Sequence, residues 1–132
     1  MAYAGYLLKV NGVIFPNKYI LMDSYKSTPH QLTDLDSYTD GDGELHRNVL
    51  PHTRSKIWFD TGILIASEKT EIKSIIPMSK TGRVRMTVEY WADDIDAYDT
   101  GSFYVPDVEF PIYDADNAMI IYNSISITFI EY

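Results

Sequence analysis

The chain has 132 residues and a net charge of −8 at pH 7, and it contains no cysteine. This length fits one domain with a single core, and the lack of cysteine excludes disulfides, thiolate metal sites and cysteine nucleophiles. The acidic balance argues against phosphate binding, which needs clustered lysine and arginine. No segment approaches the ~18 apolar residues of a membrane span, and the N-terminal residues lack a secretory signal pattern, so we expect folding in the cytoplasm.

Charge is distributed unevenly along the chain. All eleven lysines and arginines lie between Lys9 and Arg85, a segment with nine acidic residues, whereas residues 86–132 hold ten acidic residues and no lysine or arginine. If the fold places the two segments on opposite faces, identical copies would attract each other head to tail. The alternative interpretation is an acidic surface that is simply solvated.

The first part of the chain predicts a hairpin, a strand and a long loop. Two apolar runs flank Asn11-Gly12, which tolerates the positive φ angles of a type I′ turn, so residues 7–15 predict a β-hairpin. Residues 19–25 are expected to form a further strand. Residues 26–48 have little periodicity, and a loop of this length inside a compact domain is usually functional, disordered or an extended arm.

The middle of the chain predicts a strand, one helix and another strand. Residues 54–60 alternate side chains between two faces, as a strand requires. Residues 67–76 place isoleucines at helical spacing, with Ser67 able to cap the start and Pro77 ending the run. Residues 82–91 alternate again, which predicts a strand with one buried and one solvated face.

The remaining residues predict further strands. Residues 92–100 are expected to form an acidic connection, residues 102–110 an edge or bent strand interrupted by Pro106, and residues 118–132 a long β-prone run. Six to eight strands and one helix (about residues 67–76) predict a mainly β fold. It would be an antiparallel β-sandwich or partly open barrel with the helix on one flank, because parallel sheets need a helix between most strands.

The acidic stretch DLDSYTDGDGELHRN invites comparison with a calcium loop, in which oxygen ligands surround a glycine. With Asp36 as the first position of the calcium template, Asp40 and Gly41 fit the fifth and sixth positions. Tyr38 fails at the third position, and Arg47 stands where a bidentate glutamate is needed. The pattern therefore favours a solvated turn built on two Asp-Gly pairs over a metal site.

Sequence patterns for catalysis are not found. No serine lies in G-x-S-x-G, and there is no glycine-rich phosphate loop. His30, His46 and His52 show no HxH or HxxxH spacing, and the adjacent acids Asp93 and Asp94 are more simply interpreted as solvated. We therefore expect no enzymatic activity, no cofactor and no metal.

Four short motifs follow one another along the chain: Asp36-Ser37-Tyr38, the run from Gly43 to Arg47, the strand from Arg54 to Ile57, and the segment from Phe103 to Asp107. In these motifs the chain resembles a family of small structural proteins from the tails of siphophages and prophages of Gram-positive bacteria. The resemblance covers most of the chain from about Leu7 onward.

The resemblance implies a single tail-tube-like domain over residues 1–132, with a long extended loop at about residues 26–53, that assembles as a hexameric ring around the DNA channel. A distal-tail or baseplate hub component is favoured, and a tube protein is the next candidate, because all share this fold. The implied partners are further copies of the chain and other tail proteins (tube, tape measure, baseplate). DNA would only pass through the lumen, no membrane would be contacted, and the protein would belong to the virion after assembly in the host cytoplasm.

Three features of the sequence fit such a ring. A loop without periodicity can become ordered on a neighbouring subunit, the acidic residues 86–132 could line a lumen that repels DNA, and the β-rich run at residues 118–132 could join sheets between subunits. We expect Arg47 and Arg54 to pair with acids of the neighbouring copy. The expected interface residues are Asp36, Tyr38, Asp40, Asp42, Glu44, Leu45, His46, Arg47, Val49, Leu50 and Arg54.

A carbohydrate-binding or host-binding β-sandwich module is the alternative function. Aromatic residues between Tyr90 and Tyr113 could form a platform for sugars, although a period of two directs half of them into the core. A small hydrolase is a third hypothesis.

Overall fold

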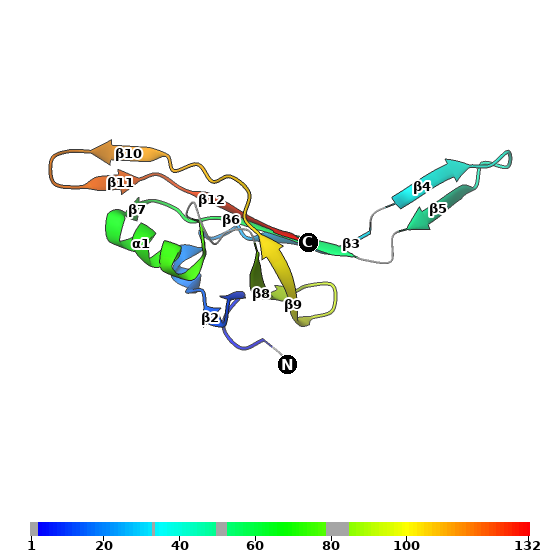
Figure 1. The fold of residues 1–132 in the computed structure, drawn as a ribbon, viewed down its shortest axis with the longest axis horizontal. Coiled ribbons are helices and arrows are strands. Elements are labelled where there is room, and N and C mark those ends of the chain that lie inside the picture. Colours follow the sequence, from blue (N-terminus) through cyan, green and yellow to red (C-terminus); the bar gives the residue numbers. More distant parts are fainter. Residues whose placement is uncertain (1–2, 33, 50–52, 79–84) are drawn as a thin grey trace.

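The computed structural model describes residues 3–32, 34–49, 53–78 and 85–132, with the backbone alone at residues 34–38 and 46–49 (Figure 1). These residues form twelve strands, one α-helix and one short 3-10 helix. The strands are β1 (Leu8–Val10), β2 (Val13–Ile14), β3 (Lys26–Gln31), β4 (Asp34–Thr39), β5 (Leu45–Val49), β6 (Arg54–Asp60), β7 (Leu64–Ile65), β8 (Met86–Ala92), β9 (Ala97–Tyr104), β10 (Ile112–Ala115), β11 (Ile120–Tyr122) and β12 (Ser126–Glu131). The helices are α1 (Ala66–Ile75) and the 3-10 helix η1 (Asn17–Tyr19).

The body is an antiparallel sheet of seven strands in the order β2-β1-β8-β9-β12-β6-β3. The sheet curls on itself, because Ser55 on β6 lies 2.6 Å from the hydroxyl of Tyr90 on β8, three positions away in this order. Alternate residues face the enclosed core, as on β8, where Met86 and Val88 are buried while Thr87 is exposed. The helix α1 buries Ile72 at the flank, beside a small sheet in the order β10-β11-β7. The predicted mainly β fold with antiparallel sheets and one flanking helix is confirmed.

Several local predictions are confirmed at their turns and ends. β1 and β2 pair around Asn11 (φ 49°) and Gly12 (φ 85°), as a type I′ hairpin requires. The helix differs from the predicted range by one residue at each end. Ser67, however, lies inside its first turn, and it is the Glu68 side chain that accepts the N–H of Ile65 at 3.1 Å.

Other local predictions are wrong. Residues 19–25 form no strand, because the end of η1 is followed by a turn with Asp23 at φ 68°. The expected acidic connection at residues 92–100 is a four-residue turn followed by β9, which pairs Ala97 with Ala92. β9 ends at Tyr104, before the proline that was expected to interrupt the strand. The β-prone run at residues 118–132 divides into β11 and β12, and residues 82–84 of the predicted strand 82–91 lie outside the described residues.

The described part of residues 26–48 contains three strands, β3, β4 and β5, rather than the expected loop. β3 joins the edge of the main sheet, and β4 and β5 pair only with each other in a two-stranded hairpin. Figure 1 shows this hairpin, residues 34–49, projecting from the body at the end opposite to β10 and β11. We call it the arm. A strand pair that lies outside the body has no core face to impose alternation, so the sequence carries little periodicity there.

Candidate assembly interface

The tip of the arm is a turn organised by Asp40. Its Oδ1 atom accepts hydrogen bonds from the backbone N–H groups of Asp42 at 2.9 Å and Glu44 at 3.1 Å. Its backbone N–H donates to the Glu44 carbonyl, and its carbonyl accepts the N–H of Gly43. Gly43 has φ 84°, a conformation that glycine adopts without steric cost. The predicted turn is confirmed, and the Asp40 carboxylate binds backbone N–H groups. In the described part of the chain no group of three or more His, Asp or Glu residues could hold a metal ion.

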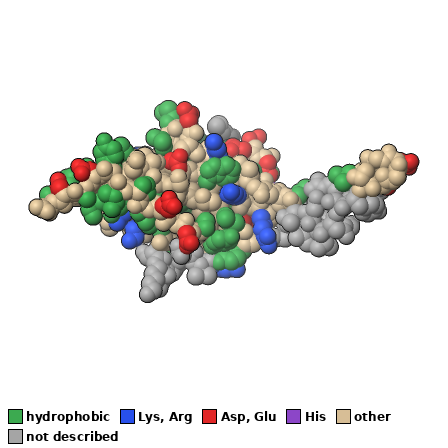
Figure 2. All heavy atoms as spheres, turned by 90° about the horizontal axis from the view of Figure 1, so that it is seen from above, with side chains coloured by type: hydrophobic (Ala, Val, Ile, Leu, Met, Phe, Trp, Pro, Cys, Tyr) green, Lys and Arg blue, Asp and Glu red, His purple; other side chains and the backbone are tan. Residues whose placement is uncertain are grey.

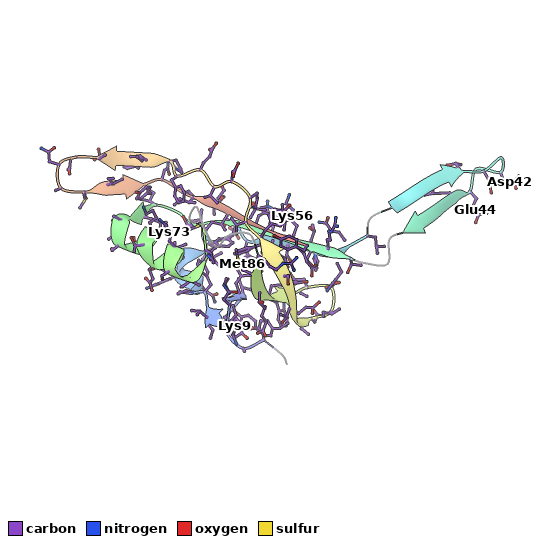
Figure 3. The ribbon with its side chains drawn as sticks, viewed as in Figure 1. Lys9, Asp42, Glu44, Lys56, Lys73 and Met86 are labelled. Atoms are coloured by element: carbon purple, nitrogen blue, oxygen red, sulfur yellow. The ribbon has the colours of Figure 1, made fainter. Side chains whose placement is uncertain are left out.

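The predicted interface residues lie along the arm and at its base. Asp42 and Glu44 point outward at the tip (Figure 3), Leu45 is 58% exposed and Arg54 is exposed at the start of β6. The backbones of Asp36 and Tyr38 on β4 and of His46, Arg47 and Val49 on β5 are described, with Tyr38 opposite His46 and Ser37 opposite Arg47. Leu50 lies outside the described residues. Their role in an interface stays a prediction.

A basic strip on the outer face of the sheet adjoins the base of the arm. Lys26, Arg54 and Lys56 are exposed there, and the Lys56 ammonium lies 5.2 Å from the ring centroid of Trp58. Lys26 pairs with Trp58 across β3 and β6, so the strip spans two adjacent strands. Arg54 forms no salt bridge to any residue whose side chain is described. A cationic surface of this kind suits an acidic partner.

The opposite end of the molecule exposes apolar side chains, of which only Tyr113 is singled out by the sequence, as part of a candidate sugar platform. Ile63, Ile65, Ile112, Tyr113 and Met119 are between 46% and 64% exposed. They lie on β7 and β10, just before β7, and in the turn between β10 and β11, and hydrophobic side chains gather at this end in Figure 2. Exposed apolar groups that cluster in this way mark interaction surfaces.

The turn between β10 and β11 is fixed in the same way as the arm tip. Asp116 Oδ1 accepts the N–H groups of Ala118 at 2.7 Å and Met119 at 2.9 Å. These two hydrogen bonds lower the pKa of the Asp116 carboxyl. Both hairpins that leave the body therefore end in a turn in which an aspartate holds backbone N–H groups.

A polar groove of about 320 Å³ lies on the body beside β12. Its lining contains two carboxylates and three hydroxyls: Asp107, Glu109, Pro111, Ser124, Ser126 and Thr128. The groove and the basic strip both lie on the outward side of the sheet, because Thr128 pairs with Trp58 and side chains opposite each other share a face.

The acidic and basic segments of the sequence do not occupy opposite faces. β8, β9 and β12, from the acidic residues 86–132, lie between β1 and β6 in one sheet. The proposed head-to-tail attraction between whole segments therefore has no structural basis. β11 has neighbours on both sides, whereas β12 pairs with β6 at residues 126–130 and with β9 only at Ile130 and Glu131. The expectation that the C-terminal run joins sheets between subunits stays a prediction. Among the described strands the edges of the three sheets are β2 and β3, β7 and β10, and both strands of the arm, β4 and β5.

A polar cluster closes one end of the core where β3 leads into the arm. The Nδ1 atom of His30 lies 2.6 Å from Asp94 Oδ2, and its Nε2 atom lies 2.6 Å from Asp99 Oδ2. The backbone N–H of His30 donates a hydrogen bond to Ser55 Oγ at 3.0 Å. The same oxygen is hydrogen-bonded to the Tyr90 hydroxyl. The sequence pattern favours surface positions for His30 and Asp94. It gives no sign of the contact between them, because the two residues are 64 positions apart along the chain.

The electrostatics of the cluster follow from these contacts. Hydrogen bonds to Asp99 and Asp94 raise the pKa of His30 above its ordinary value of 6.5, against the opposing effect of burial. Burial raises the pKa of Tyr90 to about 12, although its hydrogen bond with Ser55 acts in the other direction. Near neutral pH the Tyr90 hydroxyl is therefore protonated and can act as a hydrogen-bond donor.

A family model matches residues 1–132, the whole chain. The chain belongs to the family of unknown function DUF6711. A search of curated proteins found no match.

Two solved structures are similar to this chain over nearly its whole length. One is a chain from the tail of an empty GTA particle with C6 symmetry, with a TM-score of 0.52 and 13% identity over 99% of this chain and 95% of that chain. Another is a chain from the sheath/tube terminator of the extracellular contractile injection system PVC in its extended state, with a TM-score of 0.41 and 14% identity over 100% and 94%. At such identities the likeness concerns the fold alone.

The helix of this DUF6711 member is too short to cross a membrane, and the same holds for the other helical segment that the structure describes. The described part of the molecule presents four surface features: the arm, the basic strip, the exposed apolar end and the acidic groove.

Proposed function

We propose that this protein is a structural subunit of a phage tail that assembles into a hexameric ring around the DNA channel. The observation that carries the proposal is the fold shared with a chain from a C6-symmetric GTA tail, which extends over nearly the full length of both chains. In this proposal residues 1–132 form one tail-tube-like domain. The protein has no enzymatic role, and it belongs to the virion after assembly in the host cytoplasm.

The two unlike ends of the molecule support a ring. The arm leaves the body at one end, and the apolar β10–β11 hairpin lies at the other (Figure 1). A contact between unlike surfaces of identical subunits repeats from copy to copy and closes into a ring when the rotation allows. The interface residues named above, from Asp36 to Arg54, would then act between neighbouring copies.

The position along the tail is part of the same proposal. A distal-tail or baseplate hub component is favoured, and a tube protein is the next candidate; neighbouring tube, tape-measure or baseplate proteins would be its partners. An acidic surface from residues 86–132 would line the lumen and repel DNA during passage. Micrographs of the intact particle, labelled through an epitope tag on this chain, would assign the position.

Mass photometry of the purified protein tests the ring. We expect a species with six times the subunit mass, alone or after addition of a tail partner, and rings in negative-stain images. A strictly monomeric protein that also ignores tail partners would refute the proposal.

The double variant Arg47→Glu, Arg54→Glu tests the part played by the arm. It should reduce the ring fraction at least tenfold, because two attractions become repulsions, while circular dichroism and the urea midpoint stay close to those of the wild type. Lys18→Glu, Lys73→Glu is a control with the same charge change away from the arm. Equal ring formation by both variants would remove Arg47 and Arg54 from the interface.

A carbohydrate-binding or host-binding module is the second candidate function. The observation that favours it is a cluster of Tyr3, Tyr6, Trp91 and Tyr98, whose rings contact one another outside the core. Tyr6 and Tyr98 stack on each other at 4.7 Å, which reduces the ring area open to a sugar. Glycan-array binding that disappears in Trp91→Ala would support this function, and a silent array would remove it.

A further inference from the structure

We infer that His30 is a positioning residue that fastens the strand leading into the arm to the β8–β9 turn, and that the fastening holds only while its imidazole is protonated. His30 lies four positions before the first residue of β4. Its two ring contacts reach Asp94 in the turn and Asp99 on β9, which belong to the other half of the curled sheet.

The backbone at His30 is shaped for this contact. The residue has φ 54°, in the left-handed region that few residues other than glycine adopt, and the pairing of β3 with β6 shifts register between Thr28 and Gln31. A bulge of this kind re-aims one side chain out of the regular alternation of a strand. Here it aims the imidazole at the two carboxylates.

The chemistry of the ring sets the dependence on protonation. A neutral imidazole has one N–H and one lone pair, whereas an imidazolium has two N–H donors. Both nitrogens of His30 lie 2.6 Å from carboxylate oxygens, which only accept hydrogen bonds when ionised. Loss of the proton therefore leaves a nitrogen lone pair against a carboxylate, which breaks one contact and adds repulsion.

No described lysine or arginine side chain forms a salt bridge with either carboxylate, that of Asp94 or that of Asp99. Tyr90 on β8 lies 3.5 Å from His30 Nε2, and Ser55 on β6 binds the His30 backbone and, through its own N–H, the carboxylate of Glu131 on β12. Within the described side chains, His30 is therefore the positive charge that balances Asp94 and Asp99.

The sign of the pH dependence follows from the raised pKa of His30. A group whose pKa is higher in the folded protein contributes its full stabilisation below the pKa of the unfolded chain, and this is lost as pH rises through the folded value. The arm is thus held at mildly acidic pH and released on the alkaline side of the His30 titration. This mechanism rests on the subunit alone, and only its effect on ring formation rests on the proposed function.

NMR titration of the histidine side chains tests the protonation step. His30 should titrate above 6.5, and Asp94→Asn and Asp99→Asn should each lower its midpoint. Asp96→Asn is the matched control. The substitution removes the same charge, and Asp96 lies in the same turn at φ 50°, which asparagine tolerates. A His30 midpoint at or below 6.5, or equal effects of all three variants, would overturn the inference.

Spin labels test the mechanical step. The chain has no cysteine, so Lys9→Cys on β1 and Asp42→Cys at the arm tip provide the only two thiols. Double electron–electron resonance measures the distance between the two spin labels, with labelled chains diluted in unlabelled protein. We expect a narrow distance distribution below the His30 midpoint and a distribution at least twice as wide above it. His30→Gln should be wide at both pH values, and Asp96→Asn should behave as the wild type.

The same distance distribution at both pH values in the wild type would refute the inference. If His30→Gln does not fold, Asp99→Asn takes its place, with widening expected at a lower pH than in the wild type. Because both measurements read single subunits, a protein that never forms rings would refute the proposed function and leave this inference standing.

Discussion

Ser55 is the residue through which the polar cluster can best be tested for its contribution to stability. It is 1% exposed, and its hydroxyl both accepts the His30 N–H at 3.0 Å and bonds the Tyr90 hydroxyl at 2.6 Å. Ser55→Ala removes one oxygen and leaves two polar groups without that partner. Leaving a buried polar group unsatisfied costs about 1–3 kcal/mol, so we expect Ser55→Ala to lower the free energy of unfolding by about 2–4 kcal/mol.

A double-mutant cycle with Tyr90→Phe separates the shared hydrogen bond from the rest. Tyr90→Phe alone should cost about 1–2 kcal/mol, because Ser55 still accepts the His30 N–H. The loss in the free energy of unfolding of the double variant should be smaller than the sum of the two single losses by about 1 kcal/mol or more. The second substitution removes a group whose hydrogen-bond partner the first has already removed.

Urea unfolding followed by tryptophan fluorescence at one fixed pH measures these differences by linear extrapolation. Ser126→Ala, with an exposed hydroxyl on β12, is the control and should stay within about 0.5 kcal/mol of the wild type. A Ser55→Ala cost within the same limit, or strictly additive costs in the cycle, would refute a stabilising role for the Ser55 hydroxyl in the cluster.

Three further predictions concern the turns and the core. Gly12→Val, at φ 85°, should lower the free energy of unfolding by about 1–2 kcal/mol in the same urea assay, and an unchanged midpoint would contradict the assigned turn. Phe129→Ala on the interior strand β12 should cost about 3–5 kcal/mol, because Phe129 is fully buried, and a cost below about 1 kcal/mol would place it outside the core. Asp40→Ala should leave the urea midpoint unchanged but accelerate amide exchange at Asp42 and Glu44 at least tenfold, with unchanged exchange counting against the hydrogen bonds of the arm tip.

The parts of the fold that the sequence predicts are those where local chemistry and burial agree. Asn11-Gly12 identifies its hairpin because the turn needs two positive φ angles, and the alternation of residues 86–91 follows from one face being in the core. The helix is recognisable for the same reason, since Ile72 and its neighbours repeat at the spacing of a buried stripe.

The parts that the sequence does not predict are those whose partners lie far away along the chain or outside the core. The arm carries no alternation because its two strands pair only with each other. In β10 all four residues are exposed, so no burial pattern marks the strand. The contact between His30 and Asp99 joins positions 69 residues apart, and no local pattern contains it. Interface residues follow the same rule, because the groups that they would contact belong to another chain and leave no pattern in this one.

The place of β12 in the middle of the sheet has a consequence during translation. Its partners are β6 and β9, and Ser126 pairs with Asp60, a residue made much earlier. Until the ribosome has released residues 126–131, the apolar faces of both partner strands lack the strand that joins them, and such non-local pairing makes folding slow. A nascent or prematurely terminated chain would therefore expose apolar surface that favours aggregation. Only subunits translated through β12 would reach a folded state, which would keep incomplete copies out of any assembly.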